Sequence, residues 1–313
     1  MAAIYKSDAG RQIVEAQYRE ALERWPVEHR QLRVPTREGE TFVIVSGQGS
    51  ATPIVLLHGS GTNASVWMHS VAEWARRFRV YAVDTIGEPG FSAPARPPFA
   101  SDAYVGWLDD VWDQLSLESA GIVGISLGGW LALEYAVKRP ARVASLSLIS
   151  PSGVGAQNMA TLVKAGLLMK LGPWGVRRAL ALVTGQRALP QEAADSLILR
   201  FRHFRPRMEA LPIRTDAELA SLTMPVQLIV GGRDALLRSS ETRDRMVRCV
   251  PNLCLAYLEH EGHILPRQTG AISDFLRDAT GTEKGRSRDG GGTEEGRSGD
   301  AAGTEEGRRP LAV

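Results

Sequence analysis

The chain has 313 residues, 43% of them hydrophobic, which is enough to bury one large core or a core with an insertion. Its 37 basic and 35 acidic residues leave a formal charge of +2, so the total charge gives no reason to expect a nucleic-acid or membrane-surface partner. No apolar stretch reaches the length of a signal-peptide core or a membrane span, and a cytoplasmic location is therefore expected by default. Cys249 and Cys254 are expected to be buried apolar side chains rather than a disulfide.

The first predicted element is an amphipathic helix over residues 7–25. Its apolar side chains recur at helical spacing, Ser7 or Asp8 can cap its start, and Pro26 follows its end. From residue 41 the pattern changes to short, near-continuous apolar runs, which are typical of strands buried on both faces. Seven such strands are expected, at 42–45, 54–57, 80–83, 121–125, 144–149, 226–230 and 253–257.

Helical patterns separate these strands and are expected at 63–77, 102–116, 127–139, 238–248 and 267–277. The alternation predicts an α/β fold with a mostly parallel sheet and helices on both faces. It breaks over residues 153–222, which have the pattern of several helices with no strand between them. We therefore predict a core domain made of residues 1–152 and 223–279, with a helical cap inserted over the carboxyl ends of the strands.

The predicted cap has a charge that the near-neutral total hides. Between Gly153 and Arg214 there are ten basic and three acidic residues, a local balance of +7. These arginines either lie on solvated helix faces or, in the group at positions 200–207, help to draw in an anionic substrate. The apolar runs at 165–172 and 179–183 are expected to line an acyl pocket.

Residues 280–313 differ in kind from the rest of the chain. They form an approximate repeat of eleven residues, rich in Gly, Glu and Arg and almost without apolar side chains. Such a segment cannot bury enough surface to offset the entropy lost on ordering. We predict a disordered tail.

The sequence GISLG at 124–128 lies where a predicted strand runs directly into a predicted helix. That is the context of a nucleophile elbow, in which flanking glycines allow the strand and the helix to approach while the serine hydroxyl projects above the sheet. A bare GxSxG pattern is weak in a chain with 32 glycines, but this context favours Ser126 as a nucleophile.

A serine nucleophile needs a base and a carboxylate that orients the base. Asp234 follows the predicted strand at 226–230, and His263 follows the next strand, which matches the chain order serine, acid, histidine. His260 is an alternative base. Asp84 precedes the serine and is expected to bond local backbone, and the aspartates at 109, 110 and 113 are expected on a solvated helix face.

An oxyanion hole requires backbone N–H donors directed at the developing alkoxide. The residue after the nucleophile, Leu127, is expected to supply one donor. The glycine-rich loop after the strand at 54–57 is expected to supply the second, from Ser60, while His58 packs beneath that loop as a structural residue.

Taken together, the motifs LLHGSG, VDTIGEPGFS, GISLGGW, GGRDALL and EGHIL resemble the α/β-hydrolase superfamily over residues 41–277. More narrowly, ERWPVEHRQLRVPTREGETFVIVSG, WLDDVWDQL and ISPSG are similar to bacterial carboxylesterases of the naproxen-esterase type. The resemblance implies an eight-stranded sheet, a helical cap, no cofactor and hydrolysis of a small-molecule ester. It carries a triad onto Ser126, Asp234 and His263, and oxyanion donors onto Ser60 and Leu127; the tail departs from the pattern.

We therefore expect a serine hydrolase that cleaves a carboxylic ester through an acyl-enzyme intermediate. The alternatives are other serine-dependent reactions on the same scaffold, namely thioester, lactone or carbon–carbon bond hydrolysis and acyl transfer. A non-catalytic member that only binds a ligand is a further alternative, because fold alone does not establish function.

Overall fold

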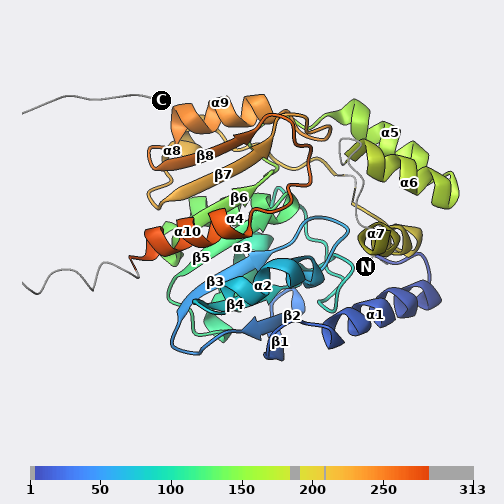
Figure 1. The fold of residues 1–313 in the computed structure, drawn as a ribbon, viewed down its shortest axis with the longest axis horizontal. Helices are drawn as coiled ribbons and strands as arrows, with labels where there is room; N and C mark the ends of the chain where they lie inside the picture. Colours follow the sequence, from blue (N-terminus) through green and yellow to red (C-terminus); the bar gives the residue numbers. More distant parts are fainter. Residues whose placement is uncertain (1–3, 184–190, 208, 282–313) are drawn as a thin grey trace, which may run out of the picture. The chain divides into compact units, whose positions relative to one another are not determined.

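An eight-stranded sheet forms the centre of the computed structural model, which describes residues 4–183, 191–207 and 209–281 (Figure 1). The strands are β1 (His29–Thr36), β2 (Gly39–Ser46), β3 (Thr52–Leu57), β4 (Phe78–Val83), β5 (Ala120–Ile125), β6 (Val143–Ile149), β7 (Val226–Gly231) and β8 (Leu253–Leu258). They lie in the order β1-β2-β4-β3-β5-β6-β7-β8, and every pair is parallel except the two that involve β2. The sheet is eight-stranded and mostly parallel, as expected. The predicted tail lies outside the described residues from 282 onward.

All seven strands expected from apolar runs are present, and the apolar pattern missed only β1. This strand forms one edge of the sheet, where most of its side chains are exposed or partly exposed, so its sequence HRQLRVPT carries no apolar run. The opposite edge is β8, which is also largely uncovered. The prediction of buried cysteines is wrong: Cys254 is exposed on this edge strand, Cys249 is partly exposed, and both thiols are free.

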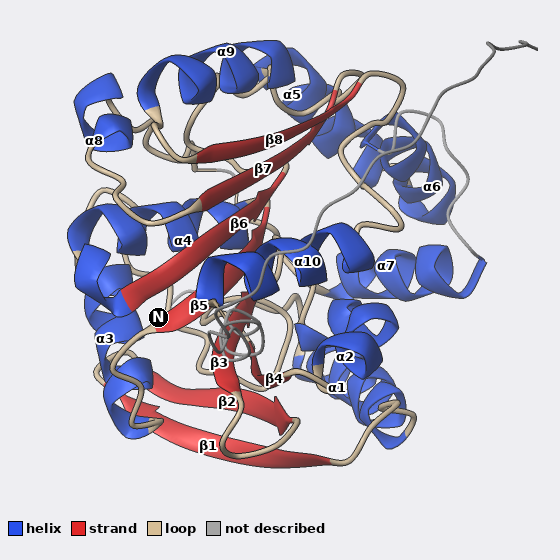
Figure 2. Cartoon of the chain, turned by 60° about the vertical axis from the view of Figure 1, so that its left-hand side comes forward, coloured by secondary structure: helices blue, strands red, loops and turns tan. Residues whose placement is uncertain are grey.

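The sheet separates two hydrophobic clusters, because side chains alternate between the faces of a strand. In β3, Val55 and Leu57 belong to one cluster, and Ile54 and Leu56 belong to the other. The first cluster is covered by α3 (Ala103–Gln114), α4 (Leu127–Lys138) and α9 (Ser239–Cys249), and the second by α2 (Met68–Trp74) and α10 (Thr269–Thr280) (Figure 2). Residues on β5 and β7 are therefore buried on both sides, as their sequences predict.

Helix α1 (Asp8–Glu23) begins as the sequence indicates. The side chain of Ser7 accepts the N–H of Gly10, while Val14, Tyr18 and Leu22 form the buried face. The remaining short elements of the core are the 3₁₀ helices η1 (Ala64–Trp67) and η2 (Pro140–Arg142).

Between β6 and β7 the described residues form α5 (Met159–Met169), α6 (Gly172–Val183), α7 (Gln191–His203) and α8 (Asp216–Ala220). This is the segment predicted as a helical cap. In both views α5 and α6 lie side by side, and α7 lies beside α1 (Figures 1 and 2). None of the described helices combines the length and the apolar character that crossing a membrane requires.

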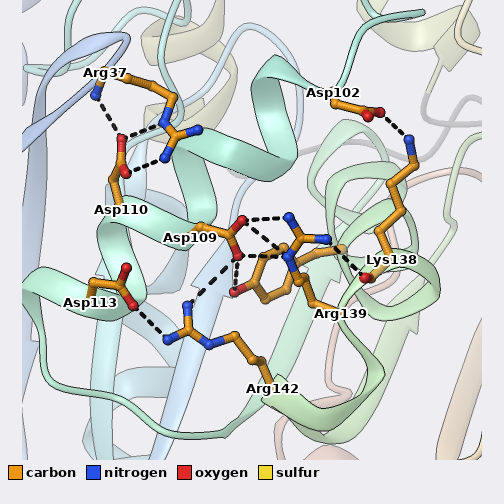
Figure 3. A network of polar contacts seen from close by, with 9 residues as sticks. Arg37, Asp102, Asp109, Asp110, Asp113, Lys138, Arg139 and Arg142 are labelled. Atoms are coloured by element: carbon orange, nitrogen blue, oxygen red, sulfur yellow. Dashed lines mark hydrogen bonds and ion pairs between the residues drawn. The ribbon is translucent and has the colours of Figure 1, made fainter.

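A network of ion pairs joins α3 to the end of α4 and to the β1–β2 turn (Figure 3). Asp109 binds the guanidinium of Arg139 at 2.8 Å, and Asp110 binds that of Arg37 at 2.8 Å. Their carboxylates are only 18% and 21% exposed, so the expected solvated face holds for Asp113 but is wrong for these two aspartates. No local pattern indicates these partners, because they lie on other elements.

Candidate active site

Ser126 lies on the tight turn between β5 and α4. Its backbone has φ 52° and ψ −108°, a left-handed conformation that costs energy for any residue other than glycine. The flanking glycines explain how the turn is possible. A Cβ on Gly124 would lie 2.8 Å from the Cα of Gly129, and a Cβ on Gly128 would overlap the carbonyl oxygen of Leu57. Only hydrogen side chains fit where this strand and this helix meet.

The structure brings Ser126, His263 and Asp234 together at the carboxyl ends of neighbouring strands. The Oγ of Ser126 lies 3.1 Å from Nε2 of His263, and Nδ1 of His263 lies 2.7 Å from Oδ2 of Asp234. The Asp234 side chain is fully buried, and that of His263 is 9% exposed. A carboxylate next to Nδ1 favours the tautomer with the proton on Nδ1, which leaves Nε2 free to accept the serine proton.

Backbone donors hold the carboxylate of Asp234 in place. Its Oδ1 accepts the N–H groups of Leu236 at 2.8 Å and Leu237 at 3.0 Å, while Oδ2 faces the histidine. The turn after β7 therefore fixes the carboxylate, since rotating it would break two hydrogen bonds in a buried place.

Ser150 is a supporting residue that the sequence reasoning did not single out. Its hydroxyl donates to the carbonyl oxygen of His263 at 3.0 Å, and its backbone N–H donates to the carbonyl of Ile229 at 2.8 Å. Ser150 is fully buried and has φ 42°. It ties the histidine loop to the end of β6.

Among the described residues, the backbone N–H groups of Leu127, the first residue of α4, and of Ser60 have no hydrogen-bond acceptor. These are the two residues that the sequence suggests as oxyanion donors. The loop with Ser60 lies against the elbow, because a Cβ placed on Gly59 would be 3.6 Å from the Cβ of Ser126. Free donors next to a hydroxyl are the arrangement that stabilises a tetrahedral oxyanion.

Glu88 binds this loop, and the sequence reasoning did not single it out as a site residue. Its Oε2 accepts the N–H of Gly61 at 2.6 Å and the hydroxyl of Ser60 at 3.4 Å. The residue is 3% exposed. Burial raises the pKa of its carboxyl to about 7, although the Gly61 N–H and the charge of Arg96 act in the opposite direction.

His58 is buried under the same loop, as expected. Its Nε2 accepts the backbone N–H of Thr85 at 3.0 Å, and its Nδ1 lies 2.9 Å from the carbonyl oxygen of Gly59. Burial lowers the pKa of His58 to about 4, and the nearby charge of Arg200 acts in the same direction. A neutral imidazole in this place is a structural bridge between the ends of β3 and β4.

The alternative residues do not reach Ser126. His260 is exposed and lies 3.3 Å from a guanidinium nitrogen of Arg233. Asp84 is buried and accepts the hydroxyl of Tyr18 at 2.9 Å and the backbone N–H of Phe91 at 2.8 Å. The second of these bonds is the local backbone contact that was expected for Asp84.

The arginines at positions 200–207 do not form one cluster. Arg202 and Arg205 are exposed, and the guanidinium carbon of Arg207 lies 3.7 Å from the ring centre of Phe99. Arg200 is 6% exposed and has no hydrogen-bond acceptor or carboxylate partner among the described residues. Burial lowers its pKa to about 10. Within the described part of the chain, no group of three His, Cys, Asp or Glu side chains is placed to hold a metal ion.

Comparisons with known proteins show which family this chain resembles. Residues 54–271 match the model of the alpha/beta hydrolase family. The chain is 29% identical over 264 residues to the uncharacterized carboxylesterase nap of Bacillus subtilis strain 168, covering 79% of this chain and 85% of that protein.

Solved structures show the same likeness. The crystal structure of carboxylesterase CesB (YbfK) from B. subtilis has a TM-score of 0.77 at 27% identity, covering 88% of this chain and 99% of that one. That of naproxen esterase from B. subtilis has a TM-score of 0.73 at 27% identity, with 89% and 97% covered. The predicted resemblance is confirmed: this chain belongs to the alpha/beta hydrolase family and is a carboxylesterase-like hydrolase.

Proposed function

We propose that this protein hydrolyses a carboxylic ester through an acyl-enzyme intermediate formed on Ser126. In the first step the Oγ of Ser126 attacks the carbonyl carbon, and Nε2 of His263 takes the hydroxyl proton. Asp234 keeps the imidazole in the correct tautomer and stabilises the imidazolium. The N–H groups of Ser60 and Leu127 donate to the negatively charged oxygen of the tetrahedral intermediate.

The intermediate collapses when the bond between the carbonyl carbon and the alcohol oxygen breaks. His263 then returns its proton to the leaving alcohol. A water molecule repeats the sequence on the acyl-enzyme: His263 takes one proton from it, the carboxylic acid leaves, and Ser126 regains its proton. No cofactor takes part in these steps.

The observation that carries the proposal is the continuous polar chain from Ser126 through His263 to Asp234, at 3.1 and 2.7 Å. The names of the similar B. subtilis carboxylesterases support an ester as the substrate. A cysteine- or aspartate-based reaction is disfavoured because the elbow position holds a serine.

We further propose that residues 153–222 act as a cap on this site. The support comes from α7, where the ring of Phe201 lies against the oxyanion loop, so close that a Cβ on Gly61 would be 2.6 Å from it. In the apolar run at 165–172, which was expected to line an acyl pocket, Leu167 and Leu171 are instead 59% and 62% exposed.

Two measurements test the proposed function. A fluorophosphonate probe should label the purified wild-type protein and leave Ser126→Ala unlabelled. A panel of aryl esters, alkyl esters, thioesters and lactones should show the highest kcat/KM for an ester. Labelling that survives the substitution removes the nucleophile assignment, and absence of turnover across the panel favours a ligand-binding member of the family.

A further inference from the structure

The helical pair α5–α6 carries the most exposed apolar surface of the described chain. Ten large hydrophobic side chains are exposed among the described residues, and five of them lie between positions 159 and 174. These five, each 51–62% exposed, are Met159, Val163, Leu167, Leu171 and Trp174. Met159, Val163 and Leu167 lie four residues apart within α5, the spacing that places side chains on one side of a helix, and Leu171 lies in the turn that follows. Met159, Val163, Leu167 and Leu171 line one groove and form an apolar stripe, and Trp174 is exposed on α6.

The same surface is strongly basic. Residues 159–183 include four basic side chains and no acidic one. Lys164 and Lys170 line an open groove of about 800 Å³ together with six apolar residues of α5 and the following turn. Neither lysine makes an ion pair with any described residue, and the guanidinium carbon of Arg178 lies 5.4 Å from the ring centre of Trp174. In the groove, apolar side chains and two lysines without an ion pair thus lie together.

The chemistry of this face limits what can cover it. A second copy of the chain would bring two sets of unpaired cations together, which like-charge repulsion opposes. A protein interface commonly has about one hydrogen bond per 100–200 Å², yet Thr161 is the only neutral hydroxyl or amide side chain between 159 and 183. A membrane interface requires no such directional partners.

We propose that the α5–α6 surface docks on anionic phospholipid membranes. The apolar stripe would enter the boundary between head groups and acyl chains, with Lys164, Lys170 and Arg178 beside lipid phosphates. Helices of 11 and 12 residues are about 16–18 Å long, far shorter than a hydrocarbon core of about 30 Å, so they lie in the interface rather than cross it.

This surface is connected to the candidate active site through the start of α5. The N–H of Asn158 donates to the carbonyl of Leu236 at 2.7 Å, and the N–H of Arg238 donates to the carbonyl of Ala156 at 3.0 Å. Leu236 is also one of the donors to Asp234. Docking would thus bring the segment after Asp234 close to esters dissolved in the lipid. This consequence rests on the proposed function, whereas the docking itself does not.

Vesicle flotation with the purified full-length protein tests the proposal. Binding is expected to phosphatidylcholine vesicles that contain phosphatidylglycerol, weaker binding to pure phosphatidylcholine, and a decrease at high salt. The double variant Leu167→Glu/Leu171→Glu should lower the partition coefficient about tenfold or more, because two charges replace apolar side chains in the stripe. Val247→Glu on α9, at a position 58% exposed, is the matched control and should bind like wild type.

A second variant separates charge from apolar contact. Lys164→Gln/Lys170→Gln should weaken binding to anionic vesicles and leave binding to neutral ones nearly unchanged. Circular dichroism and the melting temperature check that each variant is folded. Vesicle binding is measured without esterase activity, so this result does not depend on the proposed function. Absence of wild-type binding at low salt, or equal binding by the Leu167→Glu/Leu171→Glu variant, overturns the proposal; in the first case an acidic protein becomes the better candidate partner.

Discussion

The Oγ of Ser126 lies 3.1 Å from Nε2 of His263, although 137 positions of the chain separate the two residues. If this contact moves the proton, His263→Ala should lower kcat for a generic aryl ester by about 10⁴-fold or more. His260→Ala is the matched control, because this histidine is three positions away and contacts Arg233 instead. Steady-state kinetics of both variants decide the assignment, and a large loss in His260→Ala with an active His263→Ala would reverse it.

The elbow makes a second prediction, at Gly128. A Cβ there would overlap the backbone of Leu57, which no side-chain rotation can relieve. Gly128→Ala should therefore destabilise the protein by about 1–3 kcal/mol and reduce labelling of Ser126 by a fluorophosphonate. Gly49→Ala is the control, since a Cβ at Gly49 would meet no atom within 4 Å. Chemical denaturation of the two variants measures the difference, and equal stabilities would contradict the packing argument.

Glu88 makes stability depend on pH. Burial raises the pKa of its carboxyl from 4.5 to about 7, with Arg96 and Arg207 as the nearby opposing charges. Between these pH values the folded protein keeps a proton that the unfolded chain releases. The stabilisation that this group contributes is therefore fully present below pH 4.5 and decreases as the pH rises to 7.

Glu88→Gln should remove this dependence. As the pH rises from 5 to 8, the wild type should lose stability relative to Glu88→Gln. The difference in their free energies of unfolding should change by a few kcal/mol at most, at about 1.4 kcal/mol per pKa unit. Glu118→Gln, at an exposed glutamate, should show no such trend. Urea titrations at both pH values measure the effect. If the stabilities of Glu88→Gln and wild type change equally with pH, the raised pKa of Glu88 is contradicted.

Much of the candidate site could be predicted because it depends on chain order and on local patterns. Apolar runs mark the buried parallel strands, and the ends of parallel strands meet at one edge of the sheet. Asp234 and His263 therefore had to lie near Ser126 once each was placed after its strand. The elbow glycines indicated the turn itself.

The remaining features depend on tertiary contacts that no local pattern encodes. Strand β1 was missed by its pattern because an edge strand with exposed side chains has no apolar run. Glu88 and Ser150 carry polar side chains that usually lie at the surface, and only the folded loops show that both are buried and bonded. The partners of Asp109 and Asp110 likewise come from other elements.

The tail leads to a prediction from composition alone. Residues 282–313 lie outside the described part of the chain, and their Gly-, Glu- and Arg-rich sequence offers almost no apolar side chain for packing. Ending the chain after Gly281, the residue that caps α10, should leave the melting temperature and kcat/KM nearly unchanged. Differential scanning calorimetry and ester kinetics compare the two forms. A drop of several degrees in the truncated form would show that the tail packs on the rest of the protein.

Arg200 leads to a prediction of the opposite kind, in which losing a charge increases stability. Its side chain is buried, and no described residue offers its guanidinium an acceptor or a counter-ion. An unpaired buried cation is costly, so Arg200→Met, which keeps most of the volume, should raise the free energy of unfolding by about 1 kcal/mol or more. Arg202→Met, at an exposed neighbour on the same helix, should change it little. Urea denaturation measures both, and a loss of stability in Arg200→Met would mean that the guanidinium has a stabilising partner beyond the described residues.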